Sequence, residues 1–151
     1  MVVRTGLGML VVIGLLQLVP YGWSHPNPPV TQAAVWPDAE SEALARAACY
    51  DCHSNETEWP VYSYVAPMSW LVRRDVEAGR DELNLSELDQ DGGHELDDAA
   101  ETIEEGSMPP RQYLPLHPDA RLSEEEEQRL MAAFQEISGD GDNSGRGNSE
   151  D

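Results

Sequence analysis

The stretch Cys49-Tyr50-Asp51-Cys52-His53 decides the fold of this chain, because it brings both of its cysteines next to a histidine. C-x-x-C-H is the attachment signature of a c-type haem. On one helical turn, two thiols three residues apart can each form a thioether with a haem vinyl group, and the adjacent imidazole can bind the iron as an axial ligand. We therefore expect one covalent haem c, with Cys49 and Cys52 as attachment points and His53 as the proximal iron ligand.

Other interpretations of the cysteine pair are weaker. A thioredoxin-like redox pair needs a surrounding βαβ pattern, and a tetrahedral zinc site needs a second pair of ligands at suitable spacing. The sequence offers neither of these. The alternative that stays open is a pair of buried or disulfide-linked cysteines with no cofactor.

Met108-Pro109-Pro110 is the second informative stretch, about fifty-five residues beyond the first. A thioether sulfur is a soft ligand that suits haem iron, and ligation by histidine and methionine raises the reduction potential. The two prolines restrict the backbone, so that the sulfur can be held outside a helix. We expect Met108 to be the distal iron ligand. The reserve candidates are Met68, His94 and His117.

The segments around these two stretches have helical patterns. Their expected limits are an N-cap at Asp38 for a helix that runs into the cysteines, a helix from Pro67 to Gly79, a helix from His94 to Gly106, and a last helix that follows a Ser123/Glu126 capping box and ends near Ile137. The segment between Pro60 and Pro67 is expected to be a loop. The sequence therefore predicts an all-α, cytochrome-c-like domain over residues 38–137.

Aromatic side chains are concentrated between Trp59 and Trp70. A flat apolar macrocycle needs apolar cover, so we expect these rings to form a wall of the haem cavity. Arg73 and Arg74 follow directly and are candidates to bind the haem propionates.

The first 24 residues predict export. No charged residue occurs from Thr5 to Ser24, and Arg4 precedes this run, which keeps the N-terminus cytoplasmic under the positive-inside rule. We expect residues 1–24 to be a signal anchor or transmembrane segment. The haem domain then lies outside the cytoplasmic membrane of a single-pass protein; secretion after signal cleavage is the alternative.

Two further segments have little helical pattern. Residues 25–37 are Pro-rich and are expected to be a spacer that lifts the domain off the membrane. Residues 138–151 contain Gly, Ser, Asn and Asp without large apolar side chains, and are expected to be disordered.

Composition limits the partners. The 151 residues carry a net charge of −20, and all nine basic residues are arginine. This acidity argues against binding to nucleic acid, which requires a basic face, and against docking on anionic lipid through charge. It suits a basic protein partner, although a well-solvated acidic surface with no specific partner has the same composition.

From about Leu16 to Leu122 the sequence resembles the small cytochrome-c-like haem-binding domains, which are usually membrane-anchored proteins of bacteria. The resemblance follows the order of VPYG, NPPV, CYDCHSNET, WPVYSYVAPMSWL, DVEAGRDELNLS and MPPRQYLPLHPDARLS. It implies covalent haem c on Cys49 and Cys52, His53 as proximal ligand, and is consistent with Met108 as the distal one. Val61, Leu85 and Leu88 depart from the family, which commonly has aromatic residues there.

The expected function is one-electron transfer between redox partner proteins by an exported cytochrome. A haem-based sensor or gas-binding module with a labile sixth ligand is the alternative. Enzymatic turnover is not expected, because di-haem peroxidases need two attachment motifs and this chain has one.

Overall fold

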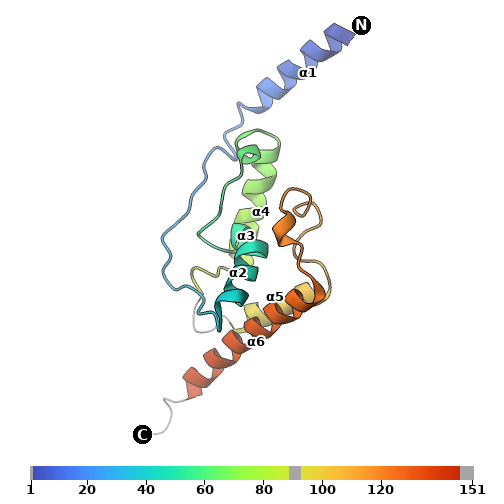
Figure 1. Cartoon of the computed structure of the whole chain (residues 1–151). Coiled ribbons are helices and arrows are strands. Elements are labelled where there is room, and N and C mark those ends of the chain that lie inside the picture. The colour runs from blue at the N-terminus through green and yellow to red at the C-terminus, as the bar shows by residue number, and fades with distance from the viewer. Residues whose placement is uncertain (1, 89–92, 147–151) are drawn as a thin grey trace.

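A computed structural model describes residues 2–88 and 93–146 (Figure 1). Within these residues the chain is helical and forms no strand, which confirms the predicted all-α class; an isolated bridge joins Gln32 to Glu87. The α-helices are α1 (Val2–Leu16), α2 (Ala39–Ala48), α3 (Tyr50–His53), α4 (Met68–Glu82), α5 (Gly93–Glu104) and α6 (Glu124–Arg146), and the short 3-10 helices are η1 (Val61–Tyr64) and η2 (Pro118–Ala120).

The predicted helix into the cysteines forms as two pieces. Asp38 caps α2 as expected, since its Oδ1 accepts hydrogen bonds from the backbone N–H groups of Glu40 at 2.9 Å and Ser41 at 2.8 Å. The axis then breaks at Cys49, whose backbone leaves the helical region (φ −123°, ψ −39°). The single turn α3 that follows carries Cys52 and His53.

Helix α4 begins after Pro67 as predicted, but its predicted end at Gly79 is wrong, because the helix continues to Glu82. Gly79 is buried where α4 meets α3, and a Cβ atom added to it would lie 2.6 Å from the carbonyl oxygen of Cys52. The missing side chain therefore lets α4 approach the cysteine-bearing turn directly.

Helices α5 and α6 pack along each other (Figure 1), and both contribute side chains to the core. Helix α5 ends at Glu104, and the predicted stop residue Gly106 follows two residues later with φ of +66°. The predicted capping box is confirmed, with the backbone N–H of Ser123 donating to Glu126 Oε2 at 2.7 Å. The core side chains of these helices include Leu96, Ile103, Leu130 and Phe134.

Helix α6 also extends beyond its predicted end at Ile137, and reaches Arg146. The hydroxyl of Ser138 donates to Asp97 Oδ1 at 2.9 Å, which holds this part of α6 against α5. The segment 138–151 that we expected to be disordered thus begins inside a helix, and its residues 147–151 lie outside the described part of the chain.

The Pro-rich segment 25–37 is part of the domain instead of a spacer. The backbone N–H groups of Gln32 and Ala34 donate to the carbonyl oxygens of Ser86 (3.1 Å) and Leu85 (2.8 Å). An extended proline-rich chain cannot satisfy its N–H and carbonyl groups internally, so those that remain pair with the segment after α4.

The N-terminal helix α1 projects away from the domain (Figure 1) and its apolar side chains are exposed. Of the helices formed by residues 2–88 and 93–146, none is both long enough and apolar enough to cross a bilayer.

Candidate functional site

A cavity of about 760 Å³ separates α3 and α4 from α5, α6 and the segment 108–116. This volume lies within the range of about 300–1,000 Å³ that is usual for cofactor sites. Its wall is mostly apolar and includes Cys49, Cys52, His53 and Met108. The structure therefore brings all four sequence-predicted site residues to one cavity.

The two cysteines are free thiols, so no disulfide closes the C-x-x-C turn. Burial raises the pKa of Cys49 to about 12, and the neighbouring Cys52 adds to the effect. Burial also raises the pKa of Cys52 to about 12, together with the carboxylates of Asp51 and Asp75. Both side chains are therefore neutral thiols at neutral pH.

The imidazole of His53 is oriented by a backbone carbonyl. Its Nδ1 lies 3.3 Å from the carbonyl oxygen of Leu83. A carbonyl oxygen can only accept, so Nδ1 carries the proton and Nε2 keeps its lone pair for a metal. Burial lowers the pKa of His53, which favours the neutral form that binds metals.

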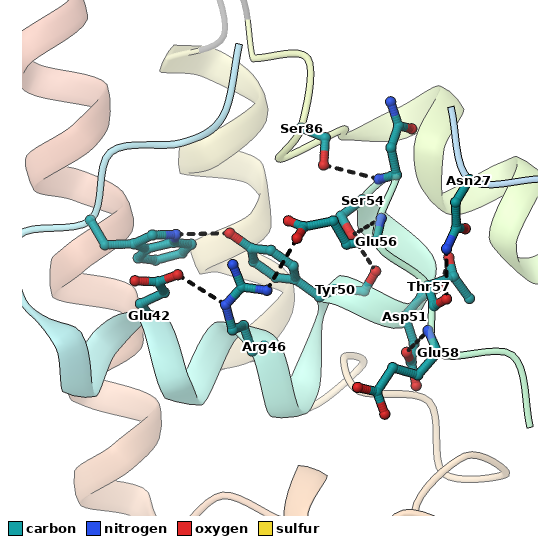
Figure 2. Close-up of polar contacts among 12 residues, drawn as sticks. Asn27, Glu42, Arg46, Tyr50, Asp51, Ser54, Glu56, Thr57, Glu58 and Ser86 are labelled. Carbon is teal, nitrogen blue, oxygen red and sulfur yellow. Dashed lines mark hydrogen bonds and ion pairs between the residues drawn. The ribbon is translucent and has the colours of Figure 1, made fainter. Parts of the chain in front are cut away.

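A network of polar contacts holds the C-x-x-C-H turn in place (Figure 2). Tyr50, a variable position of the motif, is buried and accepts a hydrogen bond on its hydroxyl from Trp36 Nε1 at 3.1 Å. Its carbonyl oxygen accepts from Ser54 Oγ at 2.7 Å, and the guanidinium of Arg46 lies over its ring at 4.5 Å. The C-x-x-C-H pattern specifies neither Tyr50 nor its contacts with Trp36, Ser54 and Arg46, which hold the turn in place.

Arg80 joins α4 to two other segments that pass the turn. Its Nε donates to the carbonyl oxygen of Ser54 at 2.7 Å, and its Nη1 donates to the carbonyl oxygen of Pro26 at 3.0 Å. Nη2 donates to Thr57 Oγ1 at 2.9 Å. No sequence pattern marks Arg80, because its hydrogen-bond partners lie more than twenty residues away along the chain and two of them are backbone carbonyls.

The opposite wall contains Met108, directly after the turn that ends α5. Its backbone N–H donates to the carbonyl oxygen of Thr102 at 3.2 Å, and its side chain is 38% exposed. Met68 also lines the cavity, from the start of α4, with the same exposure. The other reserve candidates, His94 and His117, are not part of the cavity wall.

A hydrogen bond joins these two walls of the cavity. The hydroxyl of Tyr113 donates to Asp51 Oδ2 at 2.7 Å, which ties the segment after Met108 to the C-x-x-C-H turn. Burial, with the Asp51 carboxylate, raises the pKa of Tyr113. The ring of Tyr113 is stacked on His117, with 3.7 Å between centroids. No sequence motif predicts the hydrogen bond of Tyr113 to Asp51 or its stacking on His117.

The expected aromatic wall is wrong for most of its members. Tyr62 lines the cavity, but Trp59, Tyr64 and Trp70 do not. Trp59 and Tyr64 instead pack on the ring of His25, in the segment that we expected to be a spacer. The rings of Trp59 and Tyr64 therefore hold the N-terminal segment against the domain.

The predicted arginines do not reach the cavity either. Neither Arg73 nor Arg74 lines it. Arg73 is held by Glu77 at 2.7 Å and by the carbonyl oxygen of Ser24 at 3.2 Å, on the N-terminal side of α4. The charged side chains in the described wall are carboxylates: Asp51, Asp75, Asp81, Glu82, Glu95 and Asp98.

The donor set suits haem iron and its attachment. Two free thiols on one turn match two vinyl groups, a neutral imidazole lies beside them, and a soft thioether faces them across an apolar space. A structural zinc site is not supported, since the described residues hold no cluster of three or more His, Cys, Asp or Glu side chains arranged to bind a metal ion.

Comparison with known proteins supports haem binding. A family model described as a haem-binding domain matches residues 11–136. Cytochrome c peroxidase Ccp of Escherichia coli (strain K12) is 29% identical over 142 residues, which cover 85% of this chain and 30% of that protein. The chain thus corresponds to less than a third of the length of this relative. No solved structure matches the chain.

Proposed function

The chain belongs to the family of haem-binding domains, and from this premise we propose that it is an exported c-type cytochrome that transfers one electron at a time. The observation that carries the proposal is the grouping of Cys49, Cys52, His53 and Met108 around one cavity of cofactor size. One haem, joined covalently to both cysteines, would supply an iron that changes valence between its two protein ligands.

The residues of the chain would hold this group and control its surroundings. Cys49 and Cys52 would form the thioethers, and His53 would bind the iron through Nε2 while its Nδ1–H donates a hydrogen bond to the Leu83 carbonyl oxygen. Met108 would provide the distal sulfur. The apolar wall, with Leu130 and Phe134 at its back, would exclude water and so favour the less charged, reduced state.

We propose redox proteins as the partners. The carboxylates in the cavity wall and the net charge of −20 would favour a partner with a basic docking face. The E. coli relative is named as a peroxidase, which supports a redox setting for this kind of domain. Our proposal for this chain remains electron transfer, since its single attachment motif provides one haem.

The N-terminal segment 1–24 is proposed to keep the domain at the outer face of the cytoplasmic membrane, because attachment of haem c takes place outside the cytoplasm. Removal of this segment as a signal peptide is the alternative. The two are separated by the mass of the mature protein isolated from a host that matures cytochromes.

A haem-based sensor or gas-binding module is the second candidate. Two observations favour it: the Met108 side chain is 38% exposed, and a second methionine, Met68, lies at the same cavity. A sixth ligand that is easily displaced would admit carbon monoxide or nitric oxide.

Spectra of the ferrous protein with carbon monoxide test the choice. We expect no immediate binding of carbon monoxide by the native protein. Met108→Ala should bind it at once and lose the charge-transfer band between methionine and ferric iron, because the distal position is then open. Met68→Ala is the matched control, at the same cavity with the same exposure, and should keep the band.

Two results would change the proposal. Loss of the band in Met68→Ala alone would make Met68 the ligand. Immediate binding of carbon monoxide by the native protein at neutral pH would favour the sensor.

A further inference from the structure

Two long stretches of this acidic chain contain no charged residue, namely residues 5–37 and residues 59–72. The chain has 29 Asp and Glu residues among 151, so such stretches stand out against the rest of its surface. The structure packs them against each other at the end of the domain where α1 is attached (Figure 1).

Specific contacts hold the two stretches together. The Gln17 side-chain amide makes two hydrogen bonds to Ala66, donating from Nε2 to its carbonyl oxygen at 3.1 Å and accepting from its N–H at 3.0 Å. A Cβ atom on Gly22, where φ is +84°, would lie 2.7 Å from the carbonyl oxygen of Ser69. Specific contacts therefore hold the segment between α1 and the domain in place.

The contacts continue beyond Gly22. The His25 ring stacks on Tyr64 with 4.0 Å between centroids, and its Nε2 donates to the carbonyl oxygen of Ser63 at 3.0 Å. Arg73 donates to the carbonyl oxygen of Ser24 at 3.2 Å. These bonds fix the direction in which α1 leaves the domain.

Exposed apolar and aromatic side chains cover both stretches at this end, and we call them the joint patch. The joint patch consists of Leu18, Val19, Tyr21, Trp23, Val61, Tyr64 and Val65. Val61 is 87% exposed and Trp23 is 62% exposed. The nearby Glu77 carboxylate is paired with Arg73 at 2.7 Å and accepts the Tyr21 hydroxyl at 2.9 Å, so it adds no free charge.

The joint patch continues directly from α1, in which residues 6–15 are exposed. Leu10, Val11 and Val12 are 67%, 54% and 55% exposed, although consecutive residues of a helix point about 100° apart. A helix that is apolar all round suits lipid better than a protein groove, which would cover one face. Tyr and Trp side chains just past such a helix are typical of the membrane–water interface.

We propose that the joint patch rests on the surface of the bilayer that α1 enters, so that the haem domain is held in one orientation to the membrane. This inference depends on the membrane attachment and haem proposed above. It adds that η1 and residues 18–23 form a second lipid contact. Neither residues 5–37 nor residues 59–72 contain a carboxylate, a group that would have to be desolvated at a lipid surface.

The test uses the full haem-loaded chain in stacked, oriented bilayers of phosphatidylcholine. The electron paramagnetic resonance spectrum of the ferric haem should change as the stack is rotated in the magnetic field, because all haems share one tilt. Val61→Asp combined with Val65→Asp should remove this dependence on rotation while α1 still holds the protein on the vesicles. Val35→Asp is the control, since Val35 is 83% exposed but lies outside the joint patch.

Folding of each variant is checked by its haem spectrum in solution. A native protein that floats with phosphatidylcholine vesicles but gives a spectrum independent of rotation would overturn the inference and leave the proposed function intact. The same holds if the double variant keeps the dependence on rotation. A native protein that does not float at all would overturn the membrane attachment itself.

Discussion

Single residues around the C-x-x-C-H turn define what the site can bind. The carbonyl of Leu83 selects one tautomer of His53, and burial keeps both thiols neutral. Cys49, Cys52 and His53 could be identified as candidate site residues from the sequence, because they lie within five residues of each other. The partner Leu83 could not, because it lies thirty residues further along the chain and contributes only a backbone oxygen.

Tyr113 gives a prediction at this scale. Tyr113→Phe removes the 2.7 Å hydrogen bond to Asp51, which ties the Met108 segment to the haem-bearing turn. We expect a loss of about 1.5–3 kcal/mol in the free energy of unfolding, as for other hydrogen bonds to charged groups. We also expect carbon monoxide to bind the ferrous protein faster, measured by stopped-flow spectroscopy.

Tyr64→Phe is the control for this experiment, since the Tyr64 ring stacks on His25 outside the cavity. An unchanged rate of carbon monoxide binding in Tyr113→Phe would mean that the hydrogen bond does not position the distal segment.

At the scale of helices, the ends and the packing faces differ in how well they could be predicted. The caps of α2 and α6 and the stop signal at Gly106, just after α5, depend on local residues and were predicted correctly. Gly79 was misjudged, because a glycine that permits close packing looks the same in sequence as one that ends a helix. The aromatic residues after Trp59 were also misplaced, since nothing local shows that they pack on His25.

Gly79→Ala should therefore disturb the cysteine-bearing turn α3 through its contact with α4. The added methyl would meet the Cys52 carbonyl at 2.6 Å and force α3 and α4 apart, at a cost of about 1–3 kcal/mol. We expect a lower melting temperature and less haem-loaded protein per cell. Gly139→Ala in α6 is the matched control, because nothing lies within 4 Å of its Cβ position, and it should be neutral or slightly stabilising. Equal behaviour of the two variants would contradict the packing role.

The cap of α2 gives a prediction about pH. Hydrogen bonds from the backbone of Ser41 lower the pKa of Asp38 below its usual value. The stabilisation is therefore complete above the pKa of the unfolded chain and is lost as pH falls through the lower pKa of the folded state. Asp38→Asn keeps a capping side chain but cannot titrate.

Thermal melts of both proteins between about pH 6 and pH 3 check this prediction. The native protein should lose more stability than Asp38→Asn over the acid part of this range. Parallel loss in both proteins would show that the cap does not contribute to acid sensitivity.

At the scale of the whole molecule, the charge distribution separates two ends. Six carboxylates belong to the described part of the cavity wall, whereas apolar and aromatic side chains form the joint patch at the end that carries α1. Composition alone predicted an acidic protein, but it could not show that the Pro-rich segment 25–37 folds back onto the domain, because its hydrogen bonds go to residues 85 and 86. The domain limits that we predicted from composition therefore cut through a single packed unit.

Covalent attachment of haem is the central claim, and acid–acetone extraction of the protein from a host that matures cytochromes tests it most directly. We predict that the red colour stays with the denatured polypeptide, and that the double variant Cys49→Ala, Cys52→Ala releases it into the organic phase. Extraction of the pigment from the native protein would contradict the account, because both thioethers would then be absent.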